Sequence, residues 1–327
     1  MQVIIPLAGK GTRLRPHTYL IPKPMLKVAG RPVMDWVMDR LDGLQVEELI
    51  FITGHLKEQV EAYTRSRYQV KSSYIEQKVQ DGTAGAINLA RPLIHGPAMI
   101  IFVDTVFEAD LSLAERTQAD GIIWAKEVED YQRYGVVVTD AAGYMTKIVE
   151  KPSEPISKLA NIGLYYMRNV DALWRGIDHV LASPANKGEY YLTDAFQHMI
   201  DHGCKILTAE VGGWYDCGQL ETTLETNGIL LSQGAARHPV VGPDVRLVEP
   251  VLVEDGCILE RCTIGPNVSV ESGCTIRDAS VANSIIGPGC TIDRSTMTHS
   301  MLGEKVRIAD FTGSCSIGAH SEVTGRA

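Results

Sequence analysis

Residues 3–16 read Val3-Ile4-Ile5-Pro6-Leu7-Ala8-Gly9-Lys10-Gly11-Thr12-Arg13-Leu14-Arg15-Pro16. The apolar, β-branched start of this stretch predicts a strand, and the glycines and cations that follow predict a loop at its carboxyl end. Gly9 and Gly11 allow the backbone to come close to a ligand and to turn its N–H groups toward an anion. Arg13 and the later Lys23 add fixed positive charge. We therefore expect this loop to bind a triphosphate.

Two common glycine-rich loops do not fit this stretch. A dinucleotide-binding fingerprint needs a small residue three positions after Gly11, where the chain has Leu14. A P-loop needs Gly-Lys followed by Ser or Thr, where the chain has Gly9-Lys10-Gly11. A different class of phosphate-binding loop is therefore required.

The first part of the chain alternates short β-branched runs with helical patterns. Strands are predicted at 49–53, 98–103 and 121–126, and helices at 33–41 and 56–66. Strands separated by helices predict an α/β fold with ligands at the carboxyl ends of the strands. We expect residues 1–235 to form one domain, with a Rossmann-like mixed, mostly parallel sheet and helices on both faces.

The rhythm changes to six residues in the last part of the chain. Ile264, Val270 and Ile276 lie six residues apart, and Ile-Gly-Pro recurs at 264 and at 286. A hexapeptide repeat predicts a parallel β-helix, and its likeness to known hexapeptide proteins implies the left-handed, triangular form. At about eighteen residues per turn, residues 236–327 would form a small domain of roughly five coils. We expect the irregular stretch 294–301 to carry a loop.

Composition excludes several classes of function. The chain has 327 residues, 45% of them hydrophobic, and a formal charge of -9. A net negative charge argues against general binding to nucleic acid or to anionic membranes. No run is long and apolar enough for a membrane span, and the N-terminus lacks a basic signal-peptide region, so we expect a cytoplasmic protein. The seven cysteines include no C-x-x-C pair and predict neither a zinc site nor a disulfide framework.

The pattern Gly-x-Gly-Thr-Arg-Leu-x-Pro, followed by Pro22-Lys23-Pro24-Met25-Leu26, resembles the signature of the sugar-1-phosphate nucleotidyltransferases. Among these, the chain with its hexapeptide segment is similar to glucose-1-phosphate thymidylyl- and uridylyltransferases. The resemblance implies that Arg13 and Lys23 stabilise charge on the triphosphate as catalytic residues. It also implies that the nucleotide is bound by Leu7, Ala8, Gly9, Gly11, Thr12 and Arg13.

The resemblance also implies a magnesium site. In the family, the Asp that closes a strand before a loop and the Asp of a Trp-x-Asp-x-Gly motif together hold Mg²⁺. Asp104 and Asp216 match these positions and are the expected metal ligands and catalytic carboxylates. One departure is Val103, where the family often has Gly, so the backbone there would approach the ligand less closely.

Further matches concern the sugar and the base. Glu150 and Lys151 of a Glu-Lys-Pro motif, Asn161 of an Asn-x-Gly motif, and Gly135 are the expected sugar-phosphate-binding residues. Gln77, Gly82 and Thr83 resemble the strip of the family that binds the base. Residues 188–194 also look familial, but we expect them to cap and pack a helix.

The glutamine amide of Gln77 can donate to a carbonyl oxygen and accept from the N3–H of uracil or thymine, which favours UTP or dTTP. GTP remains open, because residues 82–85, Gly-Thr-Ala-Gly, also resemble the guanylyl-transferring branch and Glu76 could accept from guanine.

We therefore expect an enzyme that transfers a nucleotidyl group from UTP or dTTP to a hexose 1-phosphate, with glucose 1-phosphate as first choice. Three alternatives remain: a mannose-1-phosphate guanylyltransferase using GTP, a bifunctional enzyme whose β-helix transfers an acyl group with His299 or His320 as base, and a non-catalytic sugar-nucleotide sensor. We prefer the β-helix as an assembly or regulatory module, because stacked coils present flat faces, and we expect a homo-oligomer.

Overall fold

The computed structural model describes residues 1–186 and 188–325. These pack into two compact units, and neither is a continuous stretch of chain. The first comprises Met1–Lys10 and Val37–Trp214, and the second comprises Gly11–Trp36 and Tyr215–Ala327. The division at 235/236 stays a prediction, and residues 326–327 of that second domain lie outside the described residues.

The first unit contains one mixed sheet. Four neighbouring strands, in the order β6-β1-β4-β5, are parallel, and β12 runs parallel to β8. The long strand β11 is antiparallel to β6, β8 and β9, and β10 is antiparallel to β9. The strands are β1 (Gln2–Pro6), β4 (Glu48–Thr53), β5 (Lys71–Glu76), β6 (Ala98–Ile101), β8 (Gly121–Glu127), β9 (Gly135–Thr139), β10 (Met145–Glu150), β11 (Leu159–Met167) and β12 (Ile206–Glu210).

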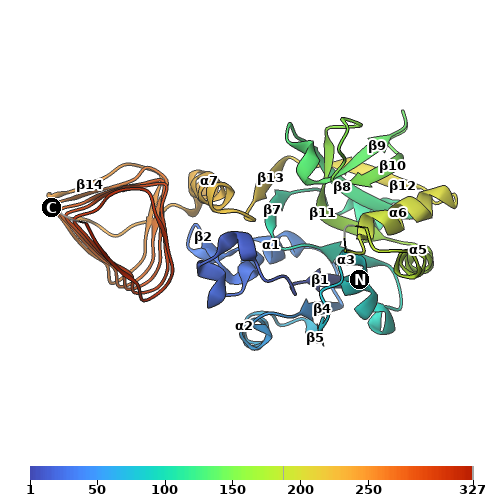
Figure 1. The fold of residues 1–327 in the computed structure, drawn as a ribbon, viewed down its shortest axis with the longest axis horizontal. Helices are drawn as coiled ribbons and strands as arrows, with labels where there is room; N and C mark the ends of the chain where they lie inside the picture. The colour runs from blue at the N-terminus through green and yellow to red at the C-terminus, as the bar shows by residue number, and fades with distance from the viewer. Residues whose placement is uncertain (187, 326–327) are drawn as a thin grey trace. The chain divides into compact units, whose positions relative to one another are not determined.

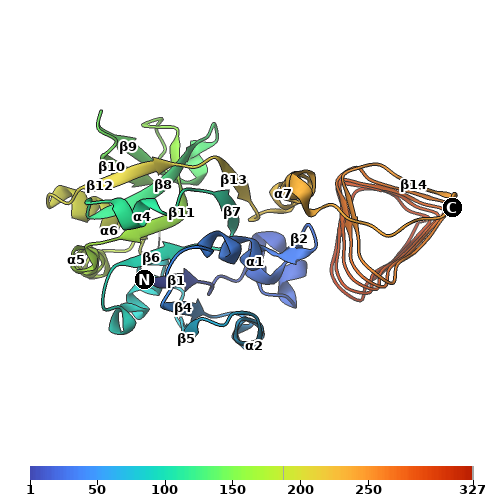
Figure 2. The same ribbon diagram turned by 180° about the vertical axis from the view of Figure 1, so that it is seen from behind.

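Helices cover this sheet because its central strands are apolar on both faces. Ile4, Ile50 and Ile100 pack in one cluster with residues of the helices α3, α5 and α6. Side chains alternate between the two faces along a strand, and the alternate residues Val3 and Leu49 are also fully buried. Both faces are therefore covered, as expected for the Rossmann-like class (Figures 1 and 2). The helices of the chain are α1 (Val33–Met38), α2 (Lys57–Arg67), α3 (Thr83–Leu89), α4 (Leu113–Arg116), α5 (Val170–Ala182), α6 (Leu192–Asp201) and α7 (Leu220–Leu230).

The last part of the second unit is a parallel β-helix with three faces, seen end-on in Figure 1. Each face is a five-stranded parallel sheet, which confirms the predicted left-handed β-helix class and its five coils. Ile264, Val270 and Ile276 are fully buried in its inner ladder. The first coil contains β14 (Val245–Leu247), β15 (Val251–Val253) and β16 (Ile258–Glu260), and the second contains β17 (Cys262–Ile264), β18 (Val268–Val270) and β19 (Thr275–Arg277).

The remaining three coils continue these sheets. They consist of β20 (Ser280–Ala282), β21 (Ile285–Ile286), β22 (Thr291–Asp293), β23 (Thr296–Thr298), β24 (Met301–Leu302), β25 (Arg307–Ala309), β26 (Thr312–Gly313), β27 (Ser316–Ile317) and β28 (Glu322–Thr324). Short strands outside these sheets are β2 (Lys27–Val28), β3 (Arg31–Pro32), β7 (Thr105–Glu108) and β13 (Gly213–Asp216).

Two details of the repeat differ from the sequence-based expectation. The coils are shorter than eighteen residues: Val251 pairs with Val268, seventeen residues on, and Met301 pairs with Ser316, fifteen residues on. The loop predicted at 294–301 is also wrong, because β23 lies within it and β24 begins at its end.

In residues 294–301 the repeat is difficult to detect from the sequence, because serines occupy buried positions. Ser295 and Ser300 are almost fully buried, and their hydroxyls donate to the carbonyls of Asp293 at 2.7 Å and of Thr298 at 2.9 Å. A buried hydroxyl with such a partner is tolerated where the repeat otherwise has an apolar residue. Arg294 and His299 adopt left-handed backbone conformations, which turn the corners without extra residues.

None of the helices within residues 1–186 and 188–325 combines the length and the apolar composition needed to cross a bilayer.

The inner ladder of the β-helix provides a test of its packing. We expect Ile276→Ala to lower the free energy of unfolding by about 2–5 kcal/mol, because Ile276 is fully buried and its loss leaves a cavity. Ile258→Ala, at a residue that is 48% exposed in the same β-helix, should cost less than about 1 kcal/mol. Chemical denaturation of both variants checks this, and equal losses would contradict the assigned inner face.

Candidate active site

In the first unit, two of the predicted sugar-binding residues, Glu150 and Asn161, meet over a third, Gly135, which is the first residue of β9. A methyl group at Gly135 would lie 2.3 Å from Asn161 Nδ2 and 2.9 Å from Glu150 Oε2. Only glycine fits at such distances, because two polar side chains converge on the space that a side chain at position 135 would need. Glu150 is the last residue of β10 and Asn161 lies in β11, which places both beside β9.

The amide of Asn161 is held by the protein on both of its ends. Its Nδ2 donates to the carbonyl of Gly135 at 3.0 Å, and its Oδ1 accepts from Gly163 N at 3.3 Å and from the hydroxyl of Tyr165. A carboxamide has two N–H donors and two oxygen lone pairs. One N–H of Asn161 therefore remains to donate to a ligand.

Glu150 is a mostly buried acid beside a cation. Thr193 Oγ1 donates to Glu150 Oε2 at 3.2 Å, and Lys151 Nζ lies 3.7 Å from Glu150 Oε1. Burial raises the pKa of Glu150, an effect that the Lys151 charge and the Thr193 hydrogen bond oppose and the Asp194 charge reinforces. Lys151 adopts a left-handed backbone conformation with φ +44°, which is rare for a side chain of this size. The adjoining surface forms a cavity of about 380 Å³ that Glu150, Asp194 and His198 line.

Asp104 lies in the turn between β6 and β7, as expected for an acid that follows a strand. Its charge, with that of Glu150, adds to burial in raising the pKa of the fully buried Tyr165. The Asp104 carboxylate thus lies within electrostatic range of the Tyr165 hydroxyl that holds Asn161. The first unit therefore brings Asp104 to the same end of the sheet as the sugar-binding cluster.

The predicted nucleotide-binding strip also forms a connected group in the first unit. Gln77 is buried, and its Nε2 donates to Asp81 Oδ1 at 3.0 Å and to the carbonyl of Gly82 at 3.3 Å. Thr83 Oγ1 accepts from Leu192 N at 2.9 Å, which ties the start of α3 to α6. With its N–H groups used in this way, Gln77 has its carbonyl oxygen left to accept from a base.

A side chain from between Gln77 and Gly82 connects this strip to the glycine-rich loop. Gln80 Nε2 donates to the carbonyl of Ala8 at 2.6 Å. Leu7 N donates to the carbonyl of Ile52 at 2.7 Å, so the chain leaves β1 alongside β4. Space around Gly9 is open, because a methyl group there would have no neighbour within 4 Å. Leu7, Ala8 and Gly9 thus belong to the same unit as Gln77, Gly82 and Thr83, and Gln80 joins the two stretches.

The second unit holds the rest of the loop. Gly11 has φ +59°, and a methyl group there would lie 2.9 Å from Thr18 Cγ2 and 3.1 Å from Lys23 Cβ. Thr18 Oγ1 donates to the carbonyl of Gly11 at 2.8 Å. Thr12 and Arg13 lie in the short 3₁₀ helix that follows Gly11. The glycine is therefore needed both for its backbone conformation and for the close approach of Lys23.

Arg13 and Asp216 lie side by side in this unit, next to Gly218. A methyl group at Gly218 would lie 2.8 Å from Asp216 Oδ1 and 3.5 Å from Arg13 Nη2. Gly218 N donates to Asp216 Oδ1 at 2.7 Å, and Thr222 Oγ1 donates to Asp216 Oδ2 at 3.1 Å. These two bonds orient the carboxylate of Asp216 beside Arg13.

This arrangement fits a magnesium ligand. Proteins bind Mg²⁺ through one or two carboxylates together with substrate phosphates, and hydrogen bonds from neighbouring groups orient such carboxylates. No group of three or more His, Cys, Asp or Glu residues forms a metal cage in the part of the chain that the structure describes. Asp104 belongs to the first unit and Asp216 to the second, and their pairing on one ion stays a prediction.

The residues that sequence reasoning missed are those that hold the predicted ones. Tyr165 and Thr193 fix Asn161 and Glu150, and Thr222 fixes Asp216. Thr193 lies in the stretch 188–194, which we expected only to cap and pack a helix. It is the second residue of α6, and its hydroxyl reaches the sugar-binding cluster as well. The resemblance of residues 188–194 to the family was the feature of the sequence that could have identified Thr193.

Comparison with known proteins identifies the family. Residues 2–233 match the family described as nucleotidyl transferase. The chain belongs to this family. The match includes every predicted site residue, from Leu7 to Asp216.

Relatives agree with this assignment. A UTP–glucose-1-phosphate uridylyltransferase, AglF of Haloferax volcanii, is 34% identical over 221 residues, covering 65% of this chain and 89% of the relative. The bifunctional protein GlmU of Methanococcus aeolicus is 33% identical over 260 residues, 78% of this chain and 61% of GlmU. The chain thus spans about three fifths of the length of that relative. A solved UDP-glucose pyrophosphorylase in complex with UDP-glucose has a TM-score of 0.64 at 25% identity, covering 71% of this chain and 98% of that protein.

The charge of Glu150 provides a test of the cluster. We expect Glu150→Gln to raise the KM for a hexose 1-phosphate about 10- to 100-fold at pH 7.5, because a charge-assisted hydrogen bond becomes a neutral one. As the pH falls through the raised pKa of Glu150, the native side chain becomes neutral too. The ratio of the two KM values should therefore shrink toward one in acid.

Two controls accompany the Glu150 variant. The phosphate of the substrate also titrates near pH 6, but it does so equally for both enzymes and cancels in the ratio. Because burial raises the pKa, the ionised Glu150 disfavours folding at neutral pH, and the variant should melt no lower than the native protein. A pH-independent KM ratio would contradict the role of the charge.

Proposed function

We propose that the protein transfers the uridylyl group of UTP to a hexose 1-phosphate, with glucose 1-phosphate as first choice, releasing pyrophosphate. The observation that carries this proposal is the convergence of Glu150 and Asn161 over Gly135 in a chain of the nucleotidyl transferase family. The names of AglF and of the UDP-glucose pyrophosphorylase support the same substrates. dTTP remains the second nucleotide, because its base presents the same N3–H to Gln77.

The sugar phosphate needs no general base. A phosphomonoester is largely dianionic at neutral pH, so its oxygen is already a nucleophile toward the α-phosphorus of the triphosphate. The barrier lies in bringing negative oxygens to a negative phosphorus and holding them in line. Arg13 and Lys23 would reduce this repulsion, and pyrophosphate would leave opposite the attacking oxygen.

Magnesium would supply further neutralisation of the phosphates, held by Asp104 and Asp216. The role of the chain is then to orient these carboxylates. Gly218 N–H donates to one oxygen of Asp216 and Thr222 O–H donates to the other, and these bonds would set the orientation in which the carboxylate meets the ion. Arg13 beside Asp216 would place a second cation next to the same phosphates.

The sugar would lie beside Glu150 and Asn161, the two side chains that converge over Gly135. There, Glu150 accepts hydrogen bonds from sugar hydroxyls and the remaining N–H of Asn161 donates one. Lys151, close to Glu150 and 5.3 Å from the ring centre of Tyr191, would meet the phosphate of the sugar. The base would give its N3–H to the carbonyl oxygen of Gln77, whose amide nitrogen is held by Asp81. A cytoplasmic location and a homo-oligomer complete the proposal, in keeping with the composition and the β-helix.

A bifunctional enzyme is the second candidate, because several relatives are named bifunctional protein GlmU and their similarity extends beyond residue 233 into the β-helix. In that case the β-helix would carry an acyl transfer. Turnover of acetyl-CoA with an amino-hexose phosphate would support it.

Pyrophosphate release tests the proposed function directly. The full chain is mixed with Mg²⁺, each nucleoside triphosphate in turn, and glucose, mannose or N-acetylglucosamine 1-phosphate. We expect release with UTP and glucose 1-phosphate, and slower release with dTTP. Release with GTP and mannose 1-phosphate alone would overturn the base assignment, and no release with any pair would favour the non-catalytic sensor.

Asp104 provides a test of the metal proposal. We expect Asp104→Asn to lower kcat about 10²-fold or more, the size seen when one electrostatic group that stabilises a transition state is removed. The variant should also need more Mg²⁺ for half-maximal rate. Asp110→Asn is the matched control. Asp110 is exposed, its Oδ2 lies 2.8 Å from Arg116 Nη2, and neither residue belongs to the predicted site. Unchanged activity of the Asp104 variant would refute its role.

A further inference from the structure

One face of the β-helix is buried on its outer side. In the sheet β15-β18-β21-β24-β27, alternate residues point into the coil, and those between them point outward. The outward residues Leu252, Ser269, Ile285 and Met301 are nevertheless no more than 4% exposed. In the other two sheets, outward residues such as Arg246 and Arg277 are exposed. The first four coils of this face are therefore covered by other parts of the second unit, whereas Ser316, the outward residue of the fifth coil, is exposed.

The cover is the helix α7 together with the segment 11–36, which carries Arg13 and Lys23. At the first coil, a methyl group at Gly30 would lie 2.8 Å from Leu252 Cδ1. At the fifth coil, His17 Nε2 lies 3.0 Å from Ser316 Oγ. The segment is thus in contact with the same face of the β-helix at both ends.

Asn227 of α7 joins the three parts. It has no exposure, and its Oδ1 accepts from Ala29 N at 2.8 Å and from Ser269 Oγ at 2.7 Å. Its Nδ2 donates to the carbonyl of Asn267 at 3.2 Å. Ala29 forms the turn between β2 and β3, and Ser269 lies in β18. A buried amide that loses such partners costs free energy, so these bonds fix the turn against the second coil.

An ion pair adds a second link at the same coil. Lys27 Nζ lies 2.6 Å from Glu271 Oε2, and the Glu271 side chain is only 10% exposed. Lys27 begins β2, two residues after the short helix Lys23–Met25 ends. The ion pair that fixes Lys27 therefore also fixes the chain just after the short helix that contains Lys23. Neither Lys27 nor Glu271 belongs to the predicted catalytic set.

We propose that this face of the β-helix positions the triphosphate-binding loop, and that Lys27, Glu271 and Asn227 act as positioning residues for Arg13 and Lys23. The inference rests on the proposed function, in which those two cations meet the triphosphate. The β-helix is then part of the nucleotide-binding machinery through the loop it supports. Sugar phosphate is bound by residues of the first unit, and its binding should not depend on this face.

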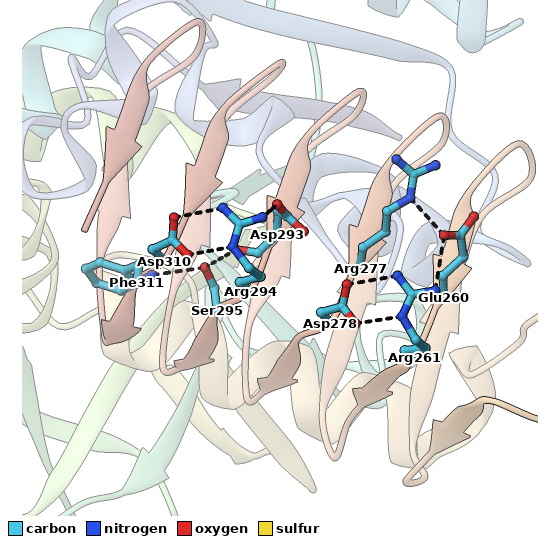
Figure 3. Close-up of polar contacts among 9 residues, drawn as sticks. All are labelled: Glu260, Arg261, Arg277, Asp278, Asp293, Arg294, Ser295, Asp310 and Phe311. Carbon is cyan, nitrogen blue, oxygen red and sulfur yellow. Dashed lines mark hydrogen bonds and ion pairs between the residues drawn. The ribbon is translucent and has the colours of Figure 1, made fainter. Parts of the chain in front are cut away.

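A matched control lies on an exposed corner of the same β-helix. Arg261 and Asp278 stack there, followed by Arg294 and Asp310, one residue per coil (Figure 3). Arg261 Nε lies 2.6 Å from Asp278 Oδ1, as short as the Lys27–Glu271 contact. Asp278→Asn thus removes an acid from an equally close ion pair, formed between two residues of this exposed corner.

The experiment compares Glu271→Gln with Asp278→Asn in the full chain. We expect Glu271→Gln to raise the KM for UTP about tenfold and to leave the KM for glucose 1-phosphate unchanged, because only the triphosphate loop is displaced. Asp278→Asn should change neither constant. Lys27→Met should resemble Glu271→Gln, and the double variant should be no worse than either single one, since both remove the same link.

Amide hydrogen exchange gives a readout that needs no activity. Peptides covering residues 11–25 should exchange faster in Glu271→Gln than in the native protein or in Asp278→Asn. Faster exchange without pyrophosphate release by the native protein would support the positioning role while refuting the proposed reaction. An active native enzyme whose Glu271→Gln variant keeps both its KM for UTP and its exchange rates would overturn the positioning role.

Discussion

The fully buried amide of Asn227 fixes three parts of the second unit relative to one another: α7, the β2–β3 turn and the second coil. An amide in a dry interior must keep its hydrogen bonds, and those of Asn227 go from α7 to two other segments, the β2–β3 turn and the second coil. A shift of α7, of the β2–β3 turn or of the second coil by one residue would break at least one of them. The packing of apolar residues such as Leu252 tolerates small slides, whereas this junction does not. The loop that carries Lys23 is thereby given a defined place on the β-helix.

In the sugar-binding cluster, unlike at Asn227, a buried polar group lowers the stability of the fold and serves ligand binding. Burial raises the pKa of Glu150, so its charge disfavours folding at neutral pH. The same burial makes an ionised Glu150 a stronger acceptor for a sugar hydroxyl, because water competes less. Lys151 and Thr193 keep the charged form accessible. The left-handed backbone of Lys151 is a further local cost at this point, of the kind that folds retain where geometry serves a ligand.

Much of this structure could be predicted from the sequence, because its signals are local. Apolar runs located the strands β4, β6 and β8, and the sixfold repeat located the β-helix. The shorter coils and the strand at 296–298 could not be predicted. There the inner position is filled by serines whose burial depends on backbone carbonyls of the neighbouring strand end. Tyr165 and Thr193 were missed for a similar reason: their role is to hold Asn161 and Glu150, and such contacts depend on the fold rather than on spacing.

The boundary of the family match and the boundaries of the two packed units fall at different residues of this chain. The family match runs without interruption from residue 2 to residue 233, because a sequence comparison follows the chain. The packing of the chain instead separates Lys10 from Gly11 and groups Gly11–Trp36 with the β-helix. The outward face that these residues cover is apolar or small, with Leu252, Ile285 and Met301, and would meet water without them. Hydrophobic burial therefore holds residues 11–36, which belong to the family's sequence, against the β-helix. A substitution in this segment changes the surface against which the β-helix packs, and a substitution on that face of the β-helix changes the surface against which the segment packs.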